Sequence, residues 1–201
     1  MGHSNRLMRW AVIASAAIVA ILLLTLRALC PDADRVESEQ YAVYSAYIEP
    51  NLTGESHDLG DRSGLVVIQE NTINRRGYGS LFSSTRHVKA NIPQLRGSVL
   101  FELFITNLLD ERLERRFHLS AKYELGTQQE INLYPFEQFT RRFPDSYGYL
   151  TFSRVAFNRD LTKAFFYTEH ICGLCGEGKY VFMRKVNGNW VVERTASTWI
   201  S

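Results

Sequence analysis

KAFFYTEHICGLCGEGKYVFMRKVNGNW, residues 163–190, is the stretch that decides the fold of this chain. It contains two strand-like runs, 163–171 and 179–186, on either side of a glycine-rich loop, and it ends in the turn 187–189. A further run follows at 190–200, and another precedes at 149–157 across a short break. Connections this short join only antiparallel neighbours. The C-terminal part of the chain therefore predicts a four-stranded antiparallel meander.

Helical patterns precede the meander. Apolar residues at spacings of three and four predict helices at 34–52, 98–112 and 136–143. The second of these, Ser98 to Arg112, carries six large apolar side chains in helical register and is expected to be the central core helix. Pro50 limits the end of the first helix.

Two strands and one connection complete the pattern. Residues 65–68 are apolar and β-branched, which predicts a buried strand, and residues 117–125 alternate apolar and polar, which predicts a half-buried one. Residues 74–93 are expected to be a polar connection. The fold class is then α+β, with a largely antiparallel sheet of about five or six strands packed on helix 98–112. A curved sheet around a helix, as in cystatin-like or NTF2-like folds, is one subtype of this class.

The N-terminus has the features of a topogenic signal. Residues 11–26 contain no charge, follow Arg6 and Arg9, and as a helix would extend roughly 24 Å. We favour an uncleaved signal anchor, because Leu26 and Leu29 fit poorly at the sites that signal cleavage and lipidation of Cys30 require. Cleavage and lipidation remain as alternatives. The positive-inside tendency leaves residues 31–201 outside the cytoplasm, in the periplasm or on the cell surface.

The charge of the remaining chain argues against a nucleic-acid partner. The full chain has 23 basic and 21 acidic side chains, and three of the basic ones, Arg6, Arg9 and Arg27, belong to the N-terminal segment. From residue 31 onward, 20 basic side chains face 21 acidic ones. A chain without a basic surplus lacks the field that holds phosphates.

Cys172 and Cys175 form the most distinctive pair of the sequence, and four interpretations compete for it. A redox dithiol requires a helix after the first cysteine, whereas a strand follows here. A zinc knuckle would need further ligands, such as His170. A structural disulfide suits an extracytoplasmic domain, with Gly173 and Gly176 permitting the tight ring, and it is the interpretation we favour. Free thiols are the fourth.

Motifs of common hydrolases, phosphate-binding loops and metalloproteases are missing from the sequence. Glu169 and His170 precede Cys172, but neighbours in a strand point to opposite faces, so Glu169 does not share the face of His170 and Cys172, and we do not expect the three to form a catalytic set. His118 is expected to be an exposed strand residue. Trp190 and Trp199, nine residues apart, are expected on opposite faces of one strand, with at least one in the core.

A resemblance extends over residues 145–201. It is carried by the following residues: Ser153-Arg154-Val155-Ala156-Phe157-Asn158, Ala164, Tyr167, Cys172-Gly173-Leu174-Cys175-Gly176, Gly178, Tyr180-Val181, Gly188-Asn189-Trp190 and Trp199-Ile200-Ser201. This pattern resembles the C-terminal hairpins of a family of uncharacterised exported or membrane-anchored bacterial proteins. The resemblance implies a location in the bacterial envelope and a domain of helices and antiparallel sheet, and it implies no activity.

These observations lead to one expectation about function. Residues 1–30 are a signal anchor, and residues 31–201 are a single extracytoplasmic α+β domain with a structural disulfide between Cys172 and Cys175. The protein is expected to be a membrane-tethered interaction or scaffold domain with no catalytic, cofactor-binding or metal-binding residues, and its protein partner is not specified. The alternatives are an exported enzyme, a small-ligand-binding domain with a pocket between helix and sheet, and a thiol or zinc site at the cysteine pair.

Overall fold

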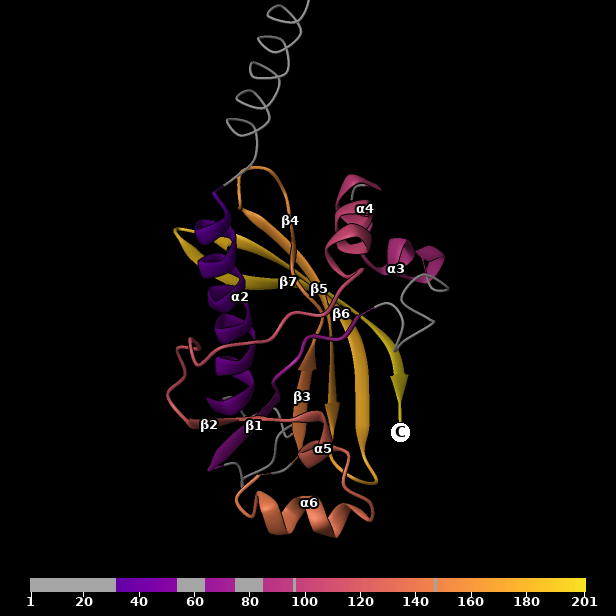
Figure 1. Ribbon diagram of the computed structural model, residues 1–201. Helices are drawn as coiled ribbons and strands as arrows, with labels where there is room; N and C mark the ends of the chain where they lie inside the picture. The colour runs from indigo at the N-terminus through magenta and orange to yellow at the C-terminus, as the bar shows by residue number, and fades with distance from the viewer. Residues whose placement is uncertain (1–31, 54–63, 75–84, 96, 147) are drawn as a thin grey trace, which may run out of the picture. The chain divides into compact units, whose positions relative to one another are not determined.

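The computed structural model describes residues 32–53, 64–74, 85–95, 97–146 and 148–201 (Figure 1). The chain divides into two units, residues 1–36 and 37–201, and the architecture below is that of the second unit. Within the described ranges, none of the helices is long and apolar enough to cross a membrane. The expected anchor at residues 1–30 falls outside the described residues.

A seven-stranded sheet forms the middle of the second unit. Its strands are β1 (Leu65–Gln69), β2 (Lys122–Gly126), β3 (Tyr149–Phe152), β4 (Ala156–Phe157), β5 (Lys163–Ile171), β6 (Gly176–Val186) and β7 (Asn189–Ile200). The order is β2-β1-β3-β5-β6-β7, with β4 beside β5. All pairs among β3 to β7 are antiparallel, which confirms the meander. The pairs of β1 with β2 and with β3 are parallel, so the sheet is mixed and larger than expected.

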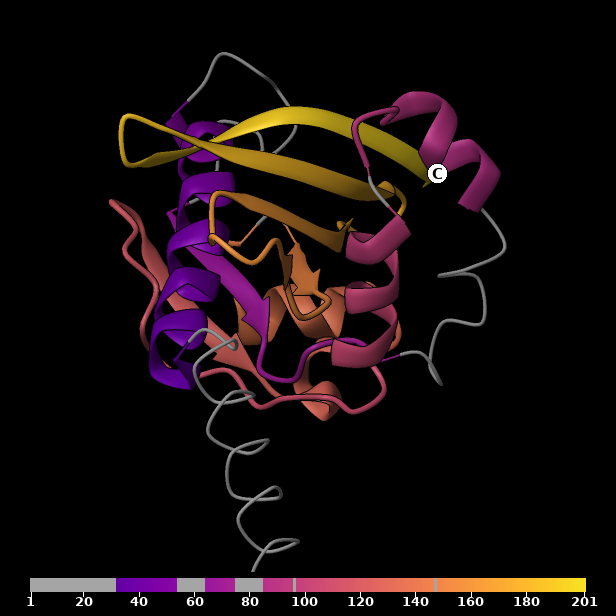
Figure 2. The same cartoon turned by 90° about the horizontal axis from the view of Figure 1, so that it is seen from above.

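Helices cover both faces of this sheet (Figure 2). Helix α2 (Ala33–Thr53) lies on one face, where Tyr44 and Ile48 belong to the same buried cluster as Phe166 and Val181. We call this the α2 face. The opposite face, which we call the α4 face, carries α3 (Thr85–Asn91) and α4 (Gly97–Thr106) over one part, and α5 (Gln128–Ile131) and α6 (Phe136–Arg142) over another. Successive residues of a strand alternate between the two faces, so β5 is buried on both.

The main difference from the sequence prediction concerns helix 98–112, which was expected to be the central core helix. Helix α4 ends at Thr106, six residues before Arg112, and it packs on the α4 face through Val99 and Leu103. The amide Nδ2 of Asn107 donates to the Leu103 carbonyl at 2.9 Å and also reaches the carbonyl of Arg154 at 3.1 Å, so the chain leaves the helix there. The helix at the main core is α2, which continues past Pro50 to Thr53.

The expected strand 149–157 is broken between β3 and β4 because side chains take over the backbone hydrogen bonds. The backbone amide of Tyr167 donates to Ser153 Oγ at 2.8 Å. The amides of Arg154 and Val155 donate to the side-chain oxygens of Asn107 (2.7 Å) and Gln40 (3.1 Å). The break therefore joins the sheet to both α2 and the exit of α4.

The expected strand 117–125 pairs only from Lys122, although its alternation of burial persists from Phe117 onward. The expected connection 74–93 contains α3, and its residues 75–84 lie outside the described residues.

Helix α6 was expected, but the one-turn helix α5 was not. A reciprocal capping box of Thr127 and Glu130 begins α5, and hydrogen bonds from Thr127 lower the pKa of Glu130.

Candidate functional site

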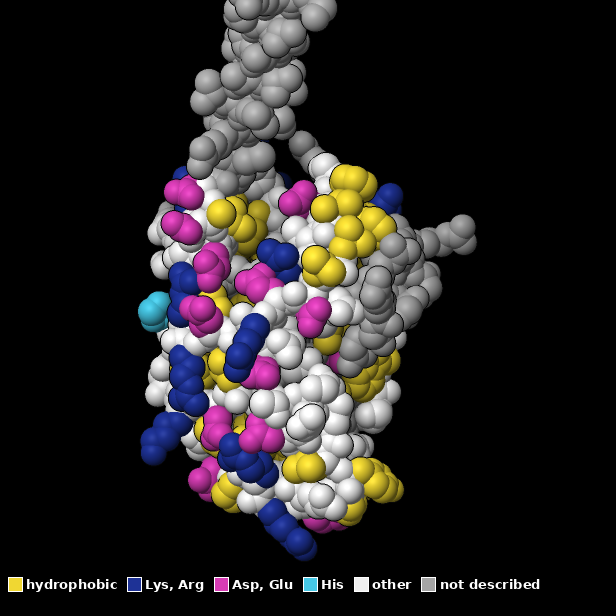
Figure 3. Space-filling model, in the orientation of Figure 1, with side chains coloured by type: hydrophobic (Ala, Val, Ile, Leu, Met, Phe, Trp, Pro, Cys, Tyr) yellow, Lys and Arg dark blue, Asp and Glu magenta, His cyan; other side chains and the backbone are white. Residues whose placement is uncertain are grey.

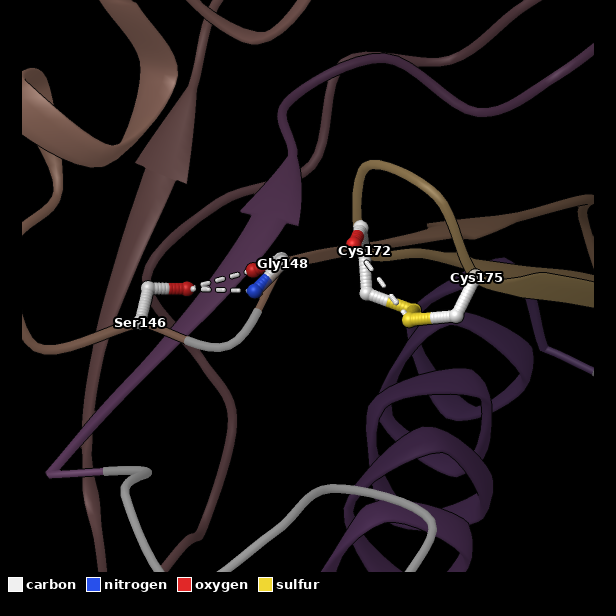
Figure 4. The surroundings of a disulfide bond; sticks show 4 residues. All are labelled: Ser146, Gly148, Cys172 and Cys175. Atoms are coloured by element: carbon white, nitrogen blue, oxygen red, sulfur yellow. Dashed lines mark hydrogen bonds between the residues drawn. A yellow bond between two sulfur atoms is a disulfide. The ribbon is translucent and has the colours of Figure 1, made fainter. Parts of the chain in front are cut away.

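The cysteine loop joins β5 to β6 (Figure 4). The Sγ atoms of Cys172 and Cys175 lie 1.89 Å apart and their Cα atoms 5.0 Å apart, which is compatible with the predicted disulfide. The backbone amide of Cys172 donates to the carbonyl of Cys175 at 2.9 Å, so the turn closes on itself. The loop therefore brings together the two residues that the sequence predicted as a pair.

Two glycines allow the cysteine loop to pack closely against its neighbours, because a side chain at either position would collide with them. Gly173 has a φ of +81°, and a Cβ there would lie 2.8 Å from the ring of Phe136 at the start of α6. Gly148 has a φ of +140°, and a Cβ there would lie 2.2 Å from the carbonyl oxygen of Ile171. Leu174 at the tip is fully exposed. The base of the loop is thus packed, while its tip faces solvent.

A buried carboxylate lies on the α4 face near the cysteine loop. Glu169 is 1% exposed, and its Oε1 accepts hydrogen bonds from the hydroxyl of Tyr167 at 3.0 Å and from the indole Nε1 of Trp199 at 3.3 Å. The same indole group lies 3.0 Å from the Tyr167 hydroxyl, to which it donates. Thr198 Oγ1 lies 3.2 Å from that hydroxyl and donates to the Gly178 carbonyl at 2.8 Å. We call Glu169, Tyr167, Trp199 and Thr198 the buried carboxylate cluster.

Glycines of β6 make room for this cluster. The indole of Trp199 lies over Gly176 and Gly178, and a Cβ at Gly178 would be 2.1 Å from Trp199 Nε1 and 2.2 Å from the Tyr167 hydroxyl. Trp190 lies on the α2 face, where it donates to Glu39 at 2.8 Å. The two tryptophans thus occupy opposite faces as expected, although two register shifts occur between β6 and β7.

One oxygen of the cluster and one oxygen next to it have no hydrogen-bond partner among the described residues. They are Glu169 Oε2 and Thr151 Oγ1, and the two residues are direct neighbours across the β3–β5 pair. Burial raises the pKa of Tyr167 to about 12 and that of Tyr149 above its usual value, and the charge of Glu169 adds to both shifts. Both tyrosines therefore remain neutral at any physiological pH, and Tyr167 can donate its hydroxyl proton to Glu169.

An exposed apolar surface lies at the end of α4 (Figure 3). Four large side chains compose it: Phe101 is 64% exposed, Ile105 43%, Leu108 43% and Leu109 72%. Phe101 also stacks on Phe104, with ring centroids 6.5 Å apart. We call these four residues the α4 surface. Single exposed apolar side chains are common, whereas a contiguous group of them is a candidate interaction site.

The segment after α4 is firmly held. Asn107 is buried and bonds both Leu103 and Arg154, and the guanidinium of Arg154 pairs with Glu111 at 2.6 Å. Glu111 also accepts from the Gln40 amide at 3.3 Å. The α4 surface is therefore presented from a fixed turn that contacts the first half of α2.

The other residues singled out in the sequence do not converge. His118 is exposed, as expected. Glu169 lies on the α4 face of the sheet and His170 on the α2 face, so the expected separation of these two side chains is confirmed. Among the residues that the structure describes, no group of three or more His, Cys, Asp or Glu side chains is placed to hold a metal ion.

The buried carboxylate cluster and the α4 surface were both missed in the sequence. A weak signal existed for the first, since Glu169 has the same parity as Phe165 and Tyr167 within a strand, and that parity points inward. Comparison with protein-family models, with curated proteins and with solved structures finds no match to this chain. The suspected family, and the cystatin-like or NTF2-like subtype, therefore stay predictions.

Proposed function

We propose that this protein is a membrane-tethered, extracytoplasmic interaction domain whose contact surface is the α4 surface. The observation that carries the proposal is the exposure of Phe101, Ile105, Leu108 and Leu109 on a rigid support. A contiguous group of such side chains in contact with water is unfavourable, by about 25 cal/mol per Å² of apolar area, unless another surface covers it. A surface that is kept rigid and apolar is suited to docking.

The tether is supported by the sequence. Residues 11–26 carry no charge and follow two arginines, and the domain after residue 31 has no basic surplus that would suit nucleic acid. The test is extraction of membranes with alkaline carbonate, followed by proteolysis of intact cells or spheroplasts. We expect full-length protein in the membrane pellet, with the domain accessible to protease from outside. A variant that lacks residues 11–26 is the control, and recovery of the unaltered full-length chain in the soluble cytoplasm would overturn the proposal.

The cysteine loop takes a structural role in this proposal. Oxidising conditions outside the cytoplasm favour a bond between Cys172 and Cys175, and their Cα distance of 5.0 Å suits one. Mass spectrometry of freshly isolated, unreduced protein tests this. A mass about two daltons below that of the dithiol peptide supports the disulfide, stoichiometric zinc supports the knuckle, and two freely alkylated thiols argue against both the bond and the location.

A small-ligand-binding domain is the second candidate, and the two unpartnered oxygens of Glu169 and Thr151 favour it. A ligand with hydrogen-bond donors would satisfy both oxygens, and Trp199 would have to move to admit it. A thermal-shift screen with small amines and amides tests this candidate. Stabilisation that disappears in Glu169→Ala but persists in Glu177→Ala, a change in the same hairpin on the other face, would support it.

A further inference from the structure

We infer that the partner of the α4 surface is the lipid bilayer itself, so that the domain lies on the membrane with Phe101, Ile105, Leu108 and Leu109 at the boundary between headgroups and acyl chains. This inference rests on the proposed tether. It adds a second point of membrane contact, which fixes the orientation of the domain instead of leaving it to swing on its linker.

The first argument is the place of the α4 surface in the fold. Gln40, one turn after the start of the second unit at Glu37, bonds to Glu111 at 3.3 Å and to the backbone of Val155 at 3.1 Å. Leu108 and Leu109 come directly before this contact in the sequence, and Asn107 binds the neighbouring Arg154. The α4 surface and the entry of the chain into the domain therefore lie at the same end, as Figure 1 also shows.

The second argument is the short link to the apolar segment. Glu37 follows Leu26, the last residue of the uncharged stretch, by about eleven residues, which reach at most about 40 Å. A tether this short keeps the entry end of the domain near the bilayer and gives the α4 surface an effective concentration there in the millimolar range. Even a weak apolar contact is then occupied for much of the time.

The third argument is chemical. The α4 surface consists of Phe, Ile and Leu, the side chains that partition into the membrane boundary. Within residues 97–110 both charged side chains, Glu102 and Asp110, are acidic and exposed, while the nearby Arg154 is paired with Glu111. Attraction to anionic lipid therefore contributes little, so contact should require neither anionic headgroups nor low salt. A protein surface that binds nucleic acid or phosphoinositides would instead be basic.

The experiment uses the full chain, one copy per nanodisc of zwitterionic phosphatidylcholine. A spin label is attached at Leu109→Cys in a Cys30→Ser background, and collision with oxygen is compared with collision with a water-soluble nickel chelate. A matched label at Gln138→Cys reports on α6, at the other end of the domain (Figure 1). We expect the ratio of oxygen to nickel collisions to be about fivefold higher at position 109 than at position 138, since oxygen concentrates in the acyl region and the chelate stays in water. The ratio should be unchanged between low and high salt.

The double variant Phe101→Ser/Ile105→Ser serves as the second arm, because both side chains are exposed and their loss should leave folding intact. In this variant the label at 109 should become as accessible to nickel as the label at 138. Equal nickel accessibility at both positions in the unaltered surface would overturn the inference. A label at 109 shielded from both reagents, and only in densely loaded liposomes, would identify a second copy as partner; that result overturns the lipid inference but keeps the interaction surface. A full chain that does not remain with the nanodisc would instead overturn the tether.

Discussion

At the scale of single residues, the packing near the C-terminus depends on Trp199, whose indole ring lies over two glycines of β6. Trp199 covers Gly176 and Gly178, and its N–H group reaches the buried Glu169 and Tyr167. Burying a carboxylate is unfavourable in free energy unless hydrogen bonds compensate for the lost hydration. The Trp199 indole and the Tyr167 hydroxyl donate such hydrogen bonds to Glu169. The absence of a side chain at Gly178 is what lets these three groups meet.

Gly178→Ala tests this arrangement. The added methyl group would lie about 2 Å from both Trp199 Nε1 and the Tyr167 hydroxyl, so the cluster must move. We expect a loss of about 1–3 kcal/mol in the free energy of unfolding, measured with urea. Gly97→Ala is the matched control, because a Cβ there meets nothing within 4 Å. An equal effect of both changes would mean that crowding at Trp199 is not the cause.

Tyr167 should make the free energy of unfolding depend on pH in the alkaline range. Burial raises its pKa to about 12 in the folded protein, while an exposed tyrosine ionises near 10. The folded state therefore retains a proton that the unfolded state loses, so this contribution is complete below pH 10 and is lost as pH rises to about 12. Tyr167→Phe should flatten the fall of unfolding free energy between these pH values, by at most about 1.4 kcal/mol per pH unit. Urea midpoints from pH 9 to 12 measure it, in a background where Cys172 and Cys175 are Ser so that the disulfide does not react. An unchanged slope would contradict the assignment.

At the scale of elements, α2 is the helix on which the main core is built. Tyr44 is completely buried, packs 4.6 Å from the ring of Phe152, and donates from its hydroxyl to the Ser153 carbonyl at 2.8 Å. Lys185 pairs with Glu39, which also accepts from Trp190, so α2 is bound to the sheet at several points. The helix is therefore fixed by polar contacts at the rim and by aromatic packing in the middle.

Tyr44→Phe removes one hydroxyl and leaves the Ser153 carbonyl without that donor in a buried place. We expect a loss of about 1–2 kcal/mol, because a buried unsatisfied acceptor costs its desolvation. Tyr134→Phe is the same chemical change at an exposed position and should be neutral. Chemical denaturation of the two variants side by side decides whether the hydroxyl matters.

The elements also show what the sequence can and cannot predict. The antiparallel meander was predictable, since turns such as 187–189 leave no other neighbour. The role of helix 98–112 was not, because apolar spacing at Phe101 and Ile105 has the same appearance whether a protein core or another surface covers it. The parallel pairing of β1 and β2 joins residues about 57 apart, and local pattern carries no information about such pairs. At the candidate site, the spacing of Cys172 and Cys175 predicted their proximity, whereas one partner of Glu169 is Tyr167 in β5 and the other is Trp199, thirty residues away in β7.

At the scale of the whole molecule, protection should be greatest in the middle of the sheet. Strand β5 has neighbours on both sides and buried residues on both faces, while β2 and β7 end the strand order. Native-state hydrogen exchange should therefore find the slowest amides in β5 and faster ones in β2 and β7. Protection of β7 equal to that of β5 in the isolated protein would contradict this and would indicate strand pairing between copies.

The strand order has a consequence for how the chain acquires its structure during synthesis. Strand β1 lies between β2 and β3, and both of these neighbours are made later than β1. As the chain emerges N-terminus first, β1 lacks its second neighbour until Tyr149–Phe152 has been made, and α2 keeps apolar surface exposed until β5 and β6 follow, because Phe166 and Val181 belong to its buried cluster. Strands β5, β6 and β7 pair in the order of their synthesis. We therefore expect the C-terminal meander to pair first and the N-terminal half to complete its packing afterwards. The N-terminal half is then the part of the nascent chain that needs protection by chaperones.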